Sequence, residues 1–194
     1  MLNELFRNGF LILEKSREKK PTPKCKNEKL PRELRRYTVH DKVHFKSHFM
    51  RFWFRFIQPN LALLEAGKID EILEIIRDDF DNYCSLGFEL LSANLLKKHF
   101  KNHDMEIYSF WTKEFEMDIF ADYDGDFIVG EVKYKERKVC KNLLNLLELK
   151  CEKLKIKPKF IALFSKSGFS KELTTLKRDD LLLFEMEDFK LLLT

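Results

Sequence analysis

The segment from Phe115 to Lys135, FEMDIFADYDGDFIVGEVKYK, constrains the fold of this chain more than any other stretch. It consists of two mainly apolar runs, FEMDIFADY and FIVGEVKYK, whose residue types and period of two are typical of β-strands. The DGD sequence between them puts Gly125 where a tight hairpin turn needs a positive φ. We therefore predict two neighbouring antiparallel strands in the core.

Charged residues interrupt both apolar runs of this hairpin. Glu131 and Lys133 are two apart, so they point to the same face of one strand. Asp118 shares a face of the other strand with Glu116. If the turn sets the register, Asp118 and Glu131 lie side by side. Two adjacent carboxylates repel each other unless a cation lies between them.

The carboxylate pair predicts a site for Mg²⁺ or Mn²⁺, because these ions prefer oxygen ligands and keep several waters. Such an ion polarises a phosphoryl oxygen and activates water, and Lys133 would orient the nucleophile or stabilise growing charge. The carboxylate oxygens of Asp118 and Glu131 must then lie within about 7 Å of each other. The alternative is an ordinary cross-strand ion pair, which contributes about 0.2–1 kcal/mol.

The segments around the hairpin predict an α+β domain from about Tyr83 onward, in the order helix, three strands, helix, strand, helix, strand. Asn102 is predicted to cap the first of these helices, and Ser170 the last. The other predicted strands are MEIYSFWTK, PKFIALFSKS and LLLFEM, and the helices are FELLSANLLKKHFKN, NLLNLLELKCEKLKI and SKELTTLKRDD.

The N-terminal part predicts a helix that runs into a strand at Gly9, a charged loop, and a brief strand, RRYTVHD. An aromatic helix, KVHFKSHFMRFWFRFIQPN, follows with Asp41 as N-cap and Pro59 at its end. A separate helix is predicted over IDEILEIIRDDFDNYCS. The predicted domains are residues 1–38, a basic segment compatible with a winged-helix remnant, residues 39–82, a helical region, and residues 83–194, the sheet domain.

Positive charge is concentrated near the N-terminus. The chain carries +4 overall, whereas Lys15 to Arg36 contains ten basic and three acidic residues. Such a block suits the phosphates of a nucleic acid, and a solvated loop is the alternative interpretation. The residues predicted to bind DNA are Lys15, Arg17, Lys19, Lys20, Lys24, Lys26, Arg35 and Arg36.

The sequence contains no run of about 18 apolar residues, so we expect no association with a membrane. It has four cysteines and no CxxC pair. Reduced thiols in the cytoplasm are therefore expected.

The hairpin resembles the PD-(D/E)XK nuclease superfamily through Asp118 before the turn and the Glu-x-Lys tripeptide from Glu131 to Lys133. The resemblance implies a restriction-endonuclease-like α+β core, a small mixed sheet flanked by helices. It also implies cleavage of DNA with Mg²⁺ or Mn²⁺. In that case Glu89 on the preceding helix adds a carboxylate, and the backbone carbonyl of Val132 is a further metal ligand.

A second resemblance runs from about Tyr37 to Phe169 and is to the domain that follows the ATPase module in archaeal-type ATPases. It implies a nuclease-like domain whose partner is an NTPase. The chain has no G-x-x-x-x-G-K-[ST] phosphate loop, so ATP hydrolysis is not expected here. The motifs are FWFRF at Phe52–Phe56, Pro59–Asn60, GFE at Gly87–Glu89, E-x-D-I at Glu116–Ile119, GE-x-K at Gly130–Lys133 and FS-x-x-GF at Phe164–Phe169.

Two alternatives to an active nuclease remain. A nuclease fold that has lost turnover would bind DNA or dock onto an ATPase without cleaving anything. A purely structural domain would bind neither a metal nor a nucleic acid.

Overall fold

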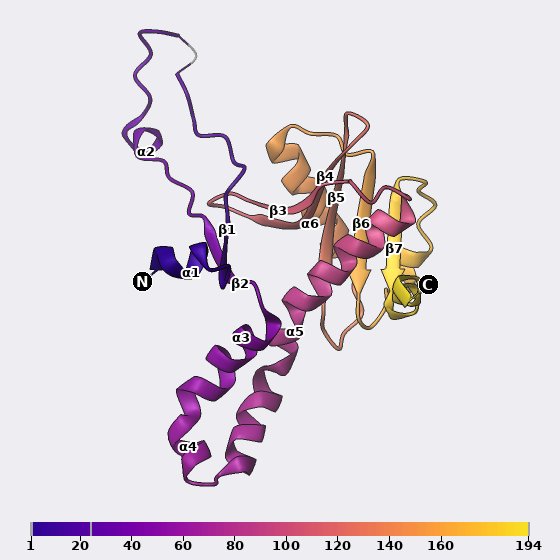
Figure 1. Cartoon of the computed structure of the whole chain (residues 1–194). Coiled ribbons are helices and arrows are strands. Elements are labelled where there is room, and N and C mark those ends of the chain that lie inside the picture. Colours follow the sequence, from indigo (N-terminus) through magenta and orange to yellow (C-terminus); the bar gives the residue numbers. More distant parts are fainter. Residues whose placement is uncertain (1, 24, 194) are drawn as a thin grey trace. The chain divides into compact units, whose positions relative to one another are not determined.

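The computed structural model describes residues 2–23 and 25–193 of the chain (Figure 1). The fold is mixed α+β, as predicted, and contains a five-stranded and a two-stranded sheet. The chain divides into two compact units. The first unit comprises Met1–Leu61 and Phe110–Phe115, and the second comprises Ala62–Ser109 and Glu116–Thr194.

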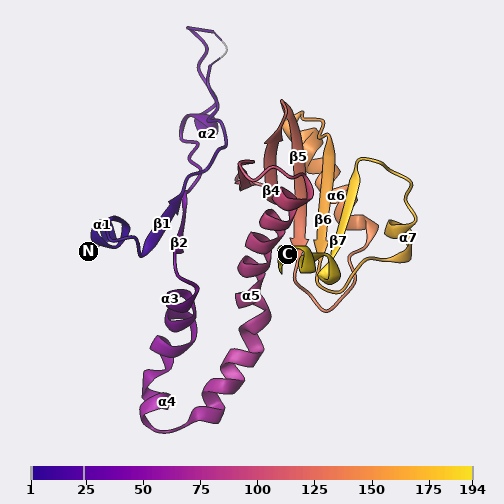
Figure 2. The same cartoon turned by 45° about the vertical axis from the view of Figure 1, so that its right-hand side comes forward.

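The larger sheet has the strand order β3-β4-β5-β6-β7 (Figure 2). β4 and β5 are antiparallel, whereas β5, β6 and β7 run parallel, so the sheet is mixed. The three strands predicted after residue 105 and the two near the C-terminus are all confirmed. Their bounds are Ile107–Trp111 for β3, Glu116–Tyr123 for β4, Asp126–Lys133 for β5, Phe160–Ser165 for β6 and Leu181–Glu185 for β7.

The hairpin between β4 and β5 has the predicted turn. Asp124 and Gly125 have φ angles of 53° and 83°, and Tyr123 pairs with Asp126 on either side of them. A two-residue loop with two positive φ angles matches the twist of the flanking strands, which fixes the register of the whole hairpin.

Gly130 lets β5 approach β6 closely beside the candidate site. A Cβ atom on Gly130 would lie 2.4 Å from the carbonyl oxygen of Ala162. No flexible side chain could relieve that contact, because the atom belongs to the backbone of β6. Glycine at this position therefore keeps Glu131, the next residue, in its place in the sheet.

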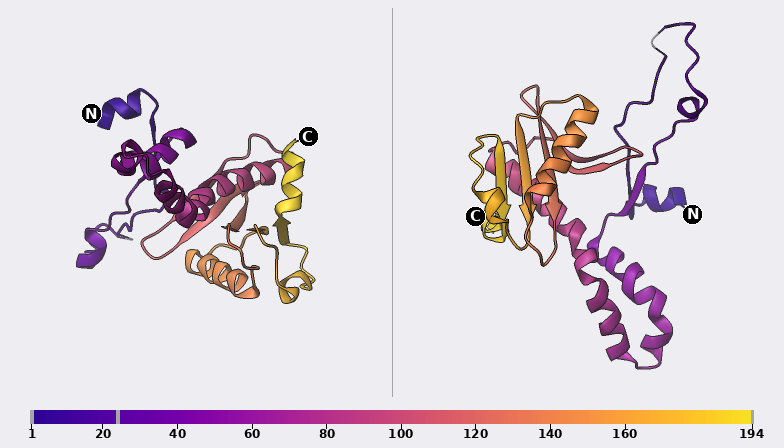
Figure 3. Two further views of the ribbon diagram at one scale, coloured as in Figure 1. Left: turned by 90° about the horizontal axis from the view of Figure 1, so that it is seen from below. Right: turned by 180° about the vertical axis from the view of Figure 1, so that it is seen from behind.

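Two helices cover opposite faces of the five-stranded sheet, as the view from below shows (Figure 3). α5, Ile69–His99, packs Phe88, Leu95 and Leu96 into the main hydrophobic core. α6, Lys141–Leu154, lies on the other face and buries Leu144, Leu147 and Cys151. The short helices α7, Lys171–Thr174, and η3, Met186–Leu193, complete this unit, and Ser170 caps α7 as predicted.

The prediction of two separate helices, one before and one after Gly87, was wrong. α5 continues through this glycine for 31 residues. A glycine inside a helix costs about 1 kcal/mol, and the burial of the apolar residues that follow it outweighs this cost. The C-cap is Phe100 rather than Asn102, and Lys101 takes the positive φ.

The first unit contains the helix-to-strand passage predicted at Gly9, formed by α1 and β1. β1 pairs antiparallel with β2, from Leu11 opposite Phe45 to Glu14 opposite Lys42. The charged loop between these strands is confirmed, apart from the short helix α2 and from Lys24, which lies outside the described residues. The bounds are Leu2–Arg7 for α1, Leu11–Glu14 for β1, Arg32–Arg35 for α2 and Lys42–Phe45 for β2.

The start of the aromatic helix was predicted wrongly. Residues 36–41 form no strand, β2 follows them, and the helix begins only at His48. The side chain of Asp41, the predicted cap, accepts a hydrogen bond from the backbone N–H of Ser16 at 3.0 Å, so it is engaged elsewhere. Ser47 caps the helix instead. The helical path is α3, His48–Phe52, then η1, Trp53–Ile57, η2, Gln58–Asn60, and α4, Leu61–Glu65.

None of the helices within residues 2–23 and 25–193 combines the length and apolar character needed to cross a bilayer.

Candidate functional site

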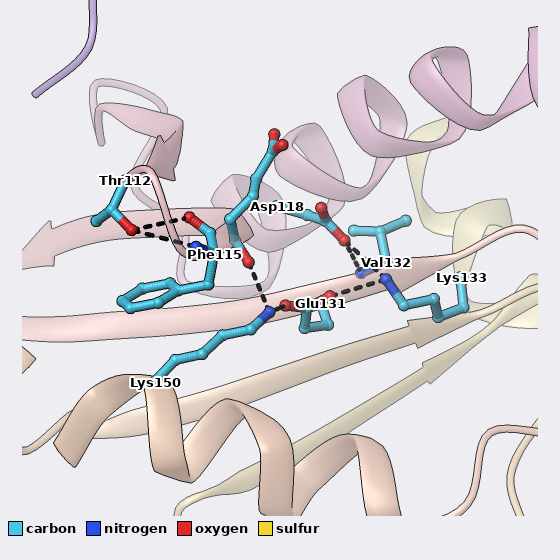
Figure 4. Close-up of polar contacts among 8 residues, drawn as sticks. Thr112, Phe115, Asp118, Glu131, Val132, Lys133 and Lys150 are labelled. Carbon is cyan, nitrogen blue, oxygen red and sulfur yellow. Dashed lines mark hydrogen bonds and ion pairs between the residues drawn. The ribbon is translucent and has the colours of Figure 1, made fainter. Parts of the chain in front are cut away.

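The site lies where β4 and β5 stop pairing. Their backbone register ends at Ile119 opposite Gly130. If this register continued by two residues, the N–H of Val132 would donate a hydrogen bond to the backbone of β4. Instead this N–H donates to the carboxylate Oδ2 of Asp118, at 2.8 Å (Figure 4). The Asp118 carboxylate thus takes the place of the β4 carbonyl that would accept this hydrogen bond in a regular sheet. The hydrogen bond from β5 fixes its orientation.

Lys133 joins the two predicted carboxylates. Its ammonium lies 2.8 Å from Oε2 of Glu131 and 3.4 Å from Oδ2 of Asp118 (Figure 4). These two oxygens cannot lie further apart than the sum of the two distances, which is below the limit of about 7 Å for sharing one ion. The structure therefore places Asp118, Glu131 and Lys133 together on one face of the sheet.

A fourth residue, Lys150 of α6, completes the group. Its ammonium contacts Oε1 of Glu131 and also hydrogen-bonds the backbone carbonyl of Glu116. Both oxygens of Glu131 therefore face an ammonium, one from β5 and one from α6. We call Asp118, Glu131, Lys133 and Lys150 the acid–lysine cluster.

Burial differs sharply within the acid–lysine cluster. The side chain of Glu131 is 4% exposed, that of Asp118 15% and that of Lys133 32%. A carboxylate as buried as Glu131 requires compensating charge, because an unpaired buried ion is strongly unfavourable. Two lysines supply that charge, and Lys133 also reaches the solvent-accessible side of the group.

The charges of the cluster balance, with two carboxylates and two ammonium groups. Burial lowers the pKa of Lys133, but attraction by Asp118 and Glu131 outweighs burial, so the pKa ends above its ordinary value. Lys133 therefore stays protonated at neutral pH. In this state it donates hydrogen bonds and stabilises anions, and it cannot act as a general base.

Sequence reasoning did not select Lys150. It belongs to one of the Glu-x-Lys tripeptides, Glu148 to Lys150, that occur outside the hairpin. The signal that could have found it was its helical spacing, since Lys150 follows Leu147 by three positions and Leu143 by seven. A lysine on the edge of an apolar helix face points toward the sheet that the face covers.

The other predicted site residues lie in different surroundings. Val132 is buried, and its N–H donates to Asp118. Glu89 is partly buried on α5, next to Phe88, whose ring lies 5.3 Å from that of Tyr134 just beyond β5. Glu89 is thus near the same end of the sheet, but its helix covers the face opposite to α6. Its role stays a prediction.

The donor set suits a hard divalent cation. Carboxylates of Asp118 and Glu131 and a backbone carbonyl are the oxygen ligands that Mg²⁺ and Mn²⁺ prefer. Among the described residues, no group of three or more His, Cys, Asp or Glu side chains is placed to hold a metal ion. Metal binding would therefore depend on these two acids, with backbone or water oxygens filling the other positions.

The basic segment predicted to bind DNA lies in the first unit. Its described members are all exposed, on the loop between β1 and β2 or at α2. Lys24 lies outside the described residues. Exposure leaves the segment accessible to a polyanion, and DNA binding by it stays a prediction. The exposed members are Lys15, Arg17, Lys19, Lys20, Lys26, Arg35 and Arg36.

The fold and cluster define a mixed α+β protein with a buried acid–lysine group at one end of its sheet. Residues 53–145 match the family model DUF234, described as "Archaea bacterial proteins of unknown function". This segment contains Glu89, Asp118, Glu131 and Lys133, and it ends before Lys150.

The chain is also similar to an uncharacterized protein of Methanocaldococcus jannaschii, with 30% identity over 161 residues. The similar region covers 76% of this chain and 35% of that relative, so the chain spans about a third of the relative's length. Neither description names an activity. No solved structure matches the chain.

Proposed function

We propose that this chain is a metal-dependent phosphodiester hydrolase that acts on DNA. The observation that carries the proposal is the convergence of Asp118, Glu131 and Lys133 where β4 and β5 separate. A buried and a partly buried acid beside a protonated lysine offer metal ligands and a positive charge within one small region. The resemblance to the PD-(D/E)XK superfamily suggests that the reaction is hydrolysis of a phosphodiester bond in DNA.

Asp118, Glu131 and the backbone carbonyl of Val132 would hold Mg²⁺ or Mn²⁺. When bound, the ion would polarise a phosphoryl oxygen and lower the pKa of a bound water. Lys133 would donate a hydrogen bond to the attacking water or to a phosphoryl oxygen, which stabilises charge in the transition state. The N–H of Val132 would hold the Asp118 carboxylate in orientation, and Glu89 would assist from α5.

The proposal extends to partners and location. The basic segment between Lys15 and Arg36 would hold the DNA backbone, and an ATPase module would be the protein partner, as the second resemblance implies. We propose a cytoplasmic location, where DNA is accessible and the four thiols stay reduced.

DNA cleavage with supercoiled and single-stranded substrates tests the proposal, with Mg²⁺ or Mn²⁺ compared against chelator. Asp118→Asn keeps an oxygen that accepts from Val132, and we expect it to lower the cleavage rate at least about 100-fold. Lys133→Ala should have a similar effect. Asp126→Asn and Lys159→Ala are matched controls, since these residues form an exposed ion pair on the same sheet and should keep full activity.

Unfolding curves and circular dichroism would show that each variant is folded before its activity is compared. Equal cleavage by wild type and Asp118→Asn would overturn the proposal, as would cleavage that persists in chelator.

The contacts of Glu131 support a second function, a nuclease-fold module that binds DNA without cutting it. Both oxygens of Glu131 face ammonium groups, so the cluster is neutral before any metal arrives. A neutral site attracts a divalent cation weakly. DNA binding that is sensitive to salt, independent of metal and accompanied by no nicking would favour this function over hydrolysis.

A further inference from the structure

A basic hollow adjoins the acid–lysine cluster on the α6 side of the sheet. It has a volume of about 380 Å³, and Lys133 forms part of its wall. Three further cationic side chains and one amide line it, together with apolar side chains. The lining comprises Lys133, Lys135, Arg137, Lys138, Val139, Cys140, Asn142, Leu143 and Leu146.

The loop that carries three of these cations is anchored at both ends. The carbonyl of Lys135 accepts a hydrogen bond from the hydroxyl of Ser167 at 2.8 Å. Val139 is buried and donates its N–H to the carbonyl of Gly168 at 2.9 Å, while its own carbonyl accepts from Ser170. The loop is thus tied to the segment after β6, so its backbone needs little ordering when an anion binds.

The charge of this loop is uncompensated on the side of the hollow. Glu136, its one acid, contacts the ammonium of Lys166, which also reaches Asp81 at 3.3 Å. Within the described part of the chain, the side chains of Lys135, Arg137 and Lys138 have no carboxylate partner. Three cations of this kind around one hollow form a strongly positive region that favours a negatively charged ligand.

The start of α6 adds a further favourable field. This helix has 14 residues, and its N-cap residue, Cys140, makes no side-chain hydrogen bond to the first turn. The N–H of Leu143 donates to the carbonyl of Cys140, so the other backbone N–H groups of that turn and the positive end of the helix dipole can interact with an anion. Asn142, in the same turn, contributes an amide donor.

We propose that this hollow binds a backbone phosphate of a DNA strand, next to the phosphate that lies at the acid–lysine cluster. The inference rests on the proposed function only in that it places the DNA strand with a neighbouring phosphate at the acid–lysine cluster. Lys135, Arg137 and Lys138 would contact the phosphate oxygens. Leu143 and Leu146, which also line the hollow, would lie against the adjoining sugar, and Lys133 would form the boundary between the two phosphate positions.

Binding measured without metal separates this proposal from cleavage. We would titrate a fluorescent single-stranded oligonucleotide with the full chain in EDTA and record anisotropy at several salt concentrations. The triple variant Lys135→Gln, Arg137→Gln, Lys138→Gln should bind at least tenfold more weakly near physiological salt. The slope of log K against log salt should fall by about 0.7 for each phosphate that the variant no longer neutralises.

The control removes the same charge elsewhere. Lys155, Lys171 and Lys177 are exposed and lie outside the hollow. Their triple glutamine variant should keep its affinity within about twofold, because a long-range effect of net charge alone is screened at this salt concentration.

Equally weakened binding by the two triple variants, or an unchanged affinity in the first, would overturn the proposal. Cleavage by wild type that depends on Asp118, together with unchanged binding by the first variant, would refute the hollow and leave the proposed function standing. Weakened binding by that variant, together with no cleavage by wild type, would support the hollow and refute hydrolysis.

Discussion

Two ion clusters contact α6, and they differ in burial and in the choice of cation. In the acid–lysine cluster, Glu131 is 4% exposed and faces two lysines. In the second, the guanidinium of Arg178 binds Asp180 through two hydrogen bonds of 2.7 and 3.0 Å and also contacts Glu148. The side chains of this arginine cluster are 31–40% exposed.

The difference in cation indicates in which cluster an incoming metal ion or phosphate can replace an existing ion-pair contact. A planar guanidinium fits a carboxylate through paired hydrogen bonds, and these contacts raise the pKa of Arg178 while lowering that of Asp180. Lysine is a point charge on a flexible stem, and an incoming metal or phosphate can replace it without breaking a paired geometry. The acid–lysine cluster is therefore the candidate for function, and the arginine cluster is a structural ion pair near the surface.

The largest expected effect comes from removing one acid from each cluster. Glu131→Ala removes the carboxylate partner of the partly buried Lys150 and leaves Lys133 with Asp118 alone, and we expect the free energy of unfolding to fall by about 3 kcal/mol. Glu148→Ala removes one exposed contact of Arg178 and should cost less than about 1 kcal/mol. Urea unfolding monitored by circular dichroism measures both values, and equal losses of stability would remove the contrast between the clusters.

An intermediate effect is expected on metal affinity. In water, two unit charges 4 Å apart interact with about 1 kcal/mol, and a divalent ion doubles that repulsion. Lys150→Gln removes this repulsion of about 2 kcal/mol and should therefore tighten Mn²⁺ binding about 30-fold, measured by calorimetry or by the spin resonance of free Mn²⁺. Lys157→Gln, a lysine outside the cluster, should leave the affinity unchanged. Unchanged affinity in Lys150→Gln would show that the ion does not bind at Glu131.

The smallest expected effect is on the pH dependence of the free energy of unfolding, which should differ between Lys133 and Arg178. Attraction by the two acids raises the folded-state pKa of Lys133 above 10.5, its ordinary value. The stability that its charge contributes is therefore fully present below pH 10.5 and is lost as pH rises through the folded-state pKa.

Wild type and Lys133→Met should thus differ in unfolding free energy by a constant amount below pH 10.5 and by less above it. The difference between wild type and Arg178→Met should stay constant over the same range, because the guanidinium remains charged. Urea unfolding at a series of pH values checks both. A Lys133 difference that grows with pH would contradict the assigned charge state.

The hairpin could be predicted because every signal for it is local. The DGD turn fixes the register, the period of two fixes the faces, and together they bring Asp118 and Glu131 to one place. The strands and helices of the larger sheet followed from similar changes of period. For these elements, local preference and the final packing agree.

The errors occurred where distant residues decide the outcome. α5 continues through Gly87 because the sheet buries the residues that follow it, and the aromatic helix begins late because β1 pairs with residues 42–45. Lys150 was missed because its spacing shows only that it lies at the edge of the apolar face of α6, whereas the packing of that helix onto the sheet decides that it reaches Glu131. The basic hollow was equally hidden, since its loop reads in sequence as an ordinary charged turn.

The hydrogen bond from Val132 to Asp118 makes one amide proton a reporter on the whole site. An event that changes the charge or orientation of that carboxylate, such as arrival of a metal, a phosphate or a proton, must alter the electron density around this N–H. Its nitrogen and proton resonances would shift on binding and exchange faster with deuterium if the carboxylate turned away. Occupancy could thus be followed in the unmodified protein, with neither turnover nor a label.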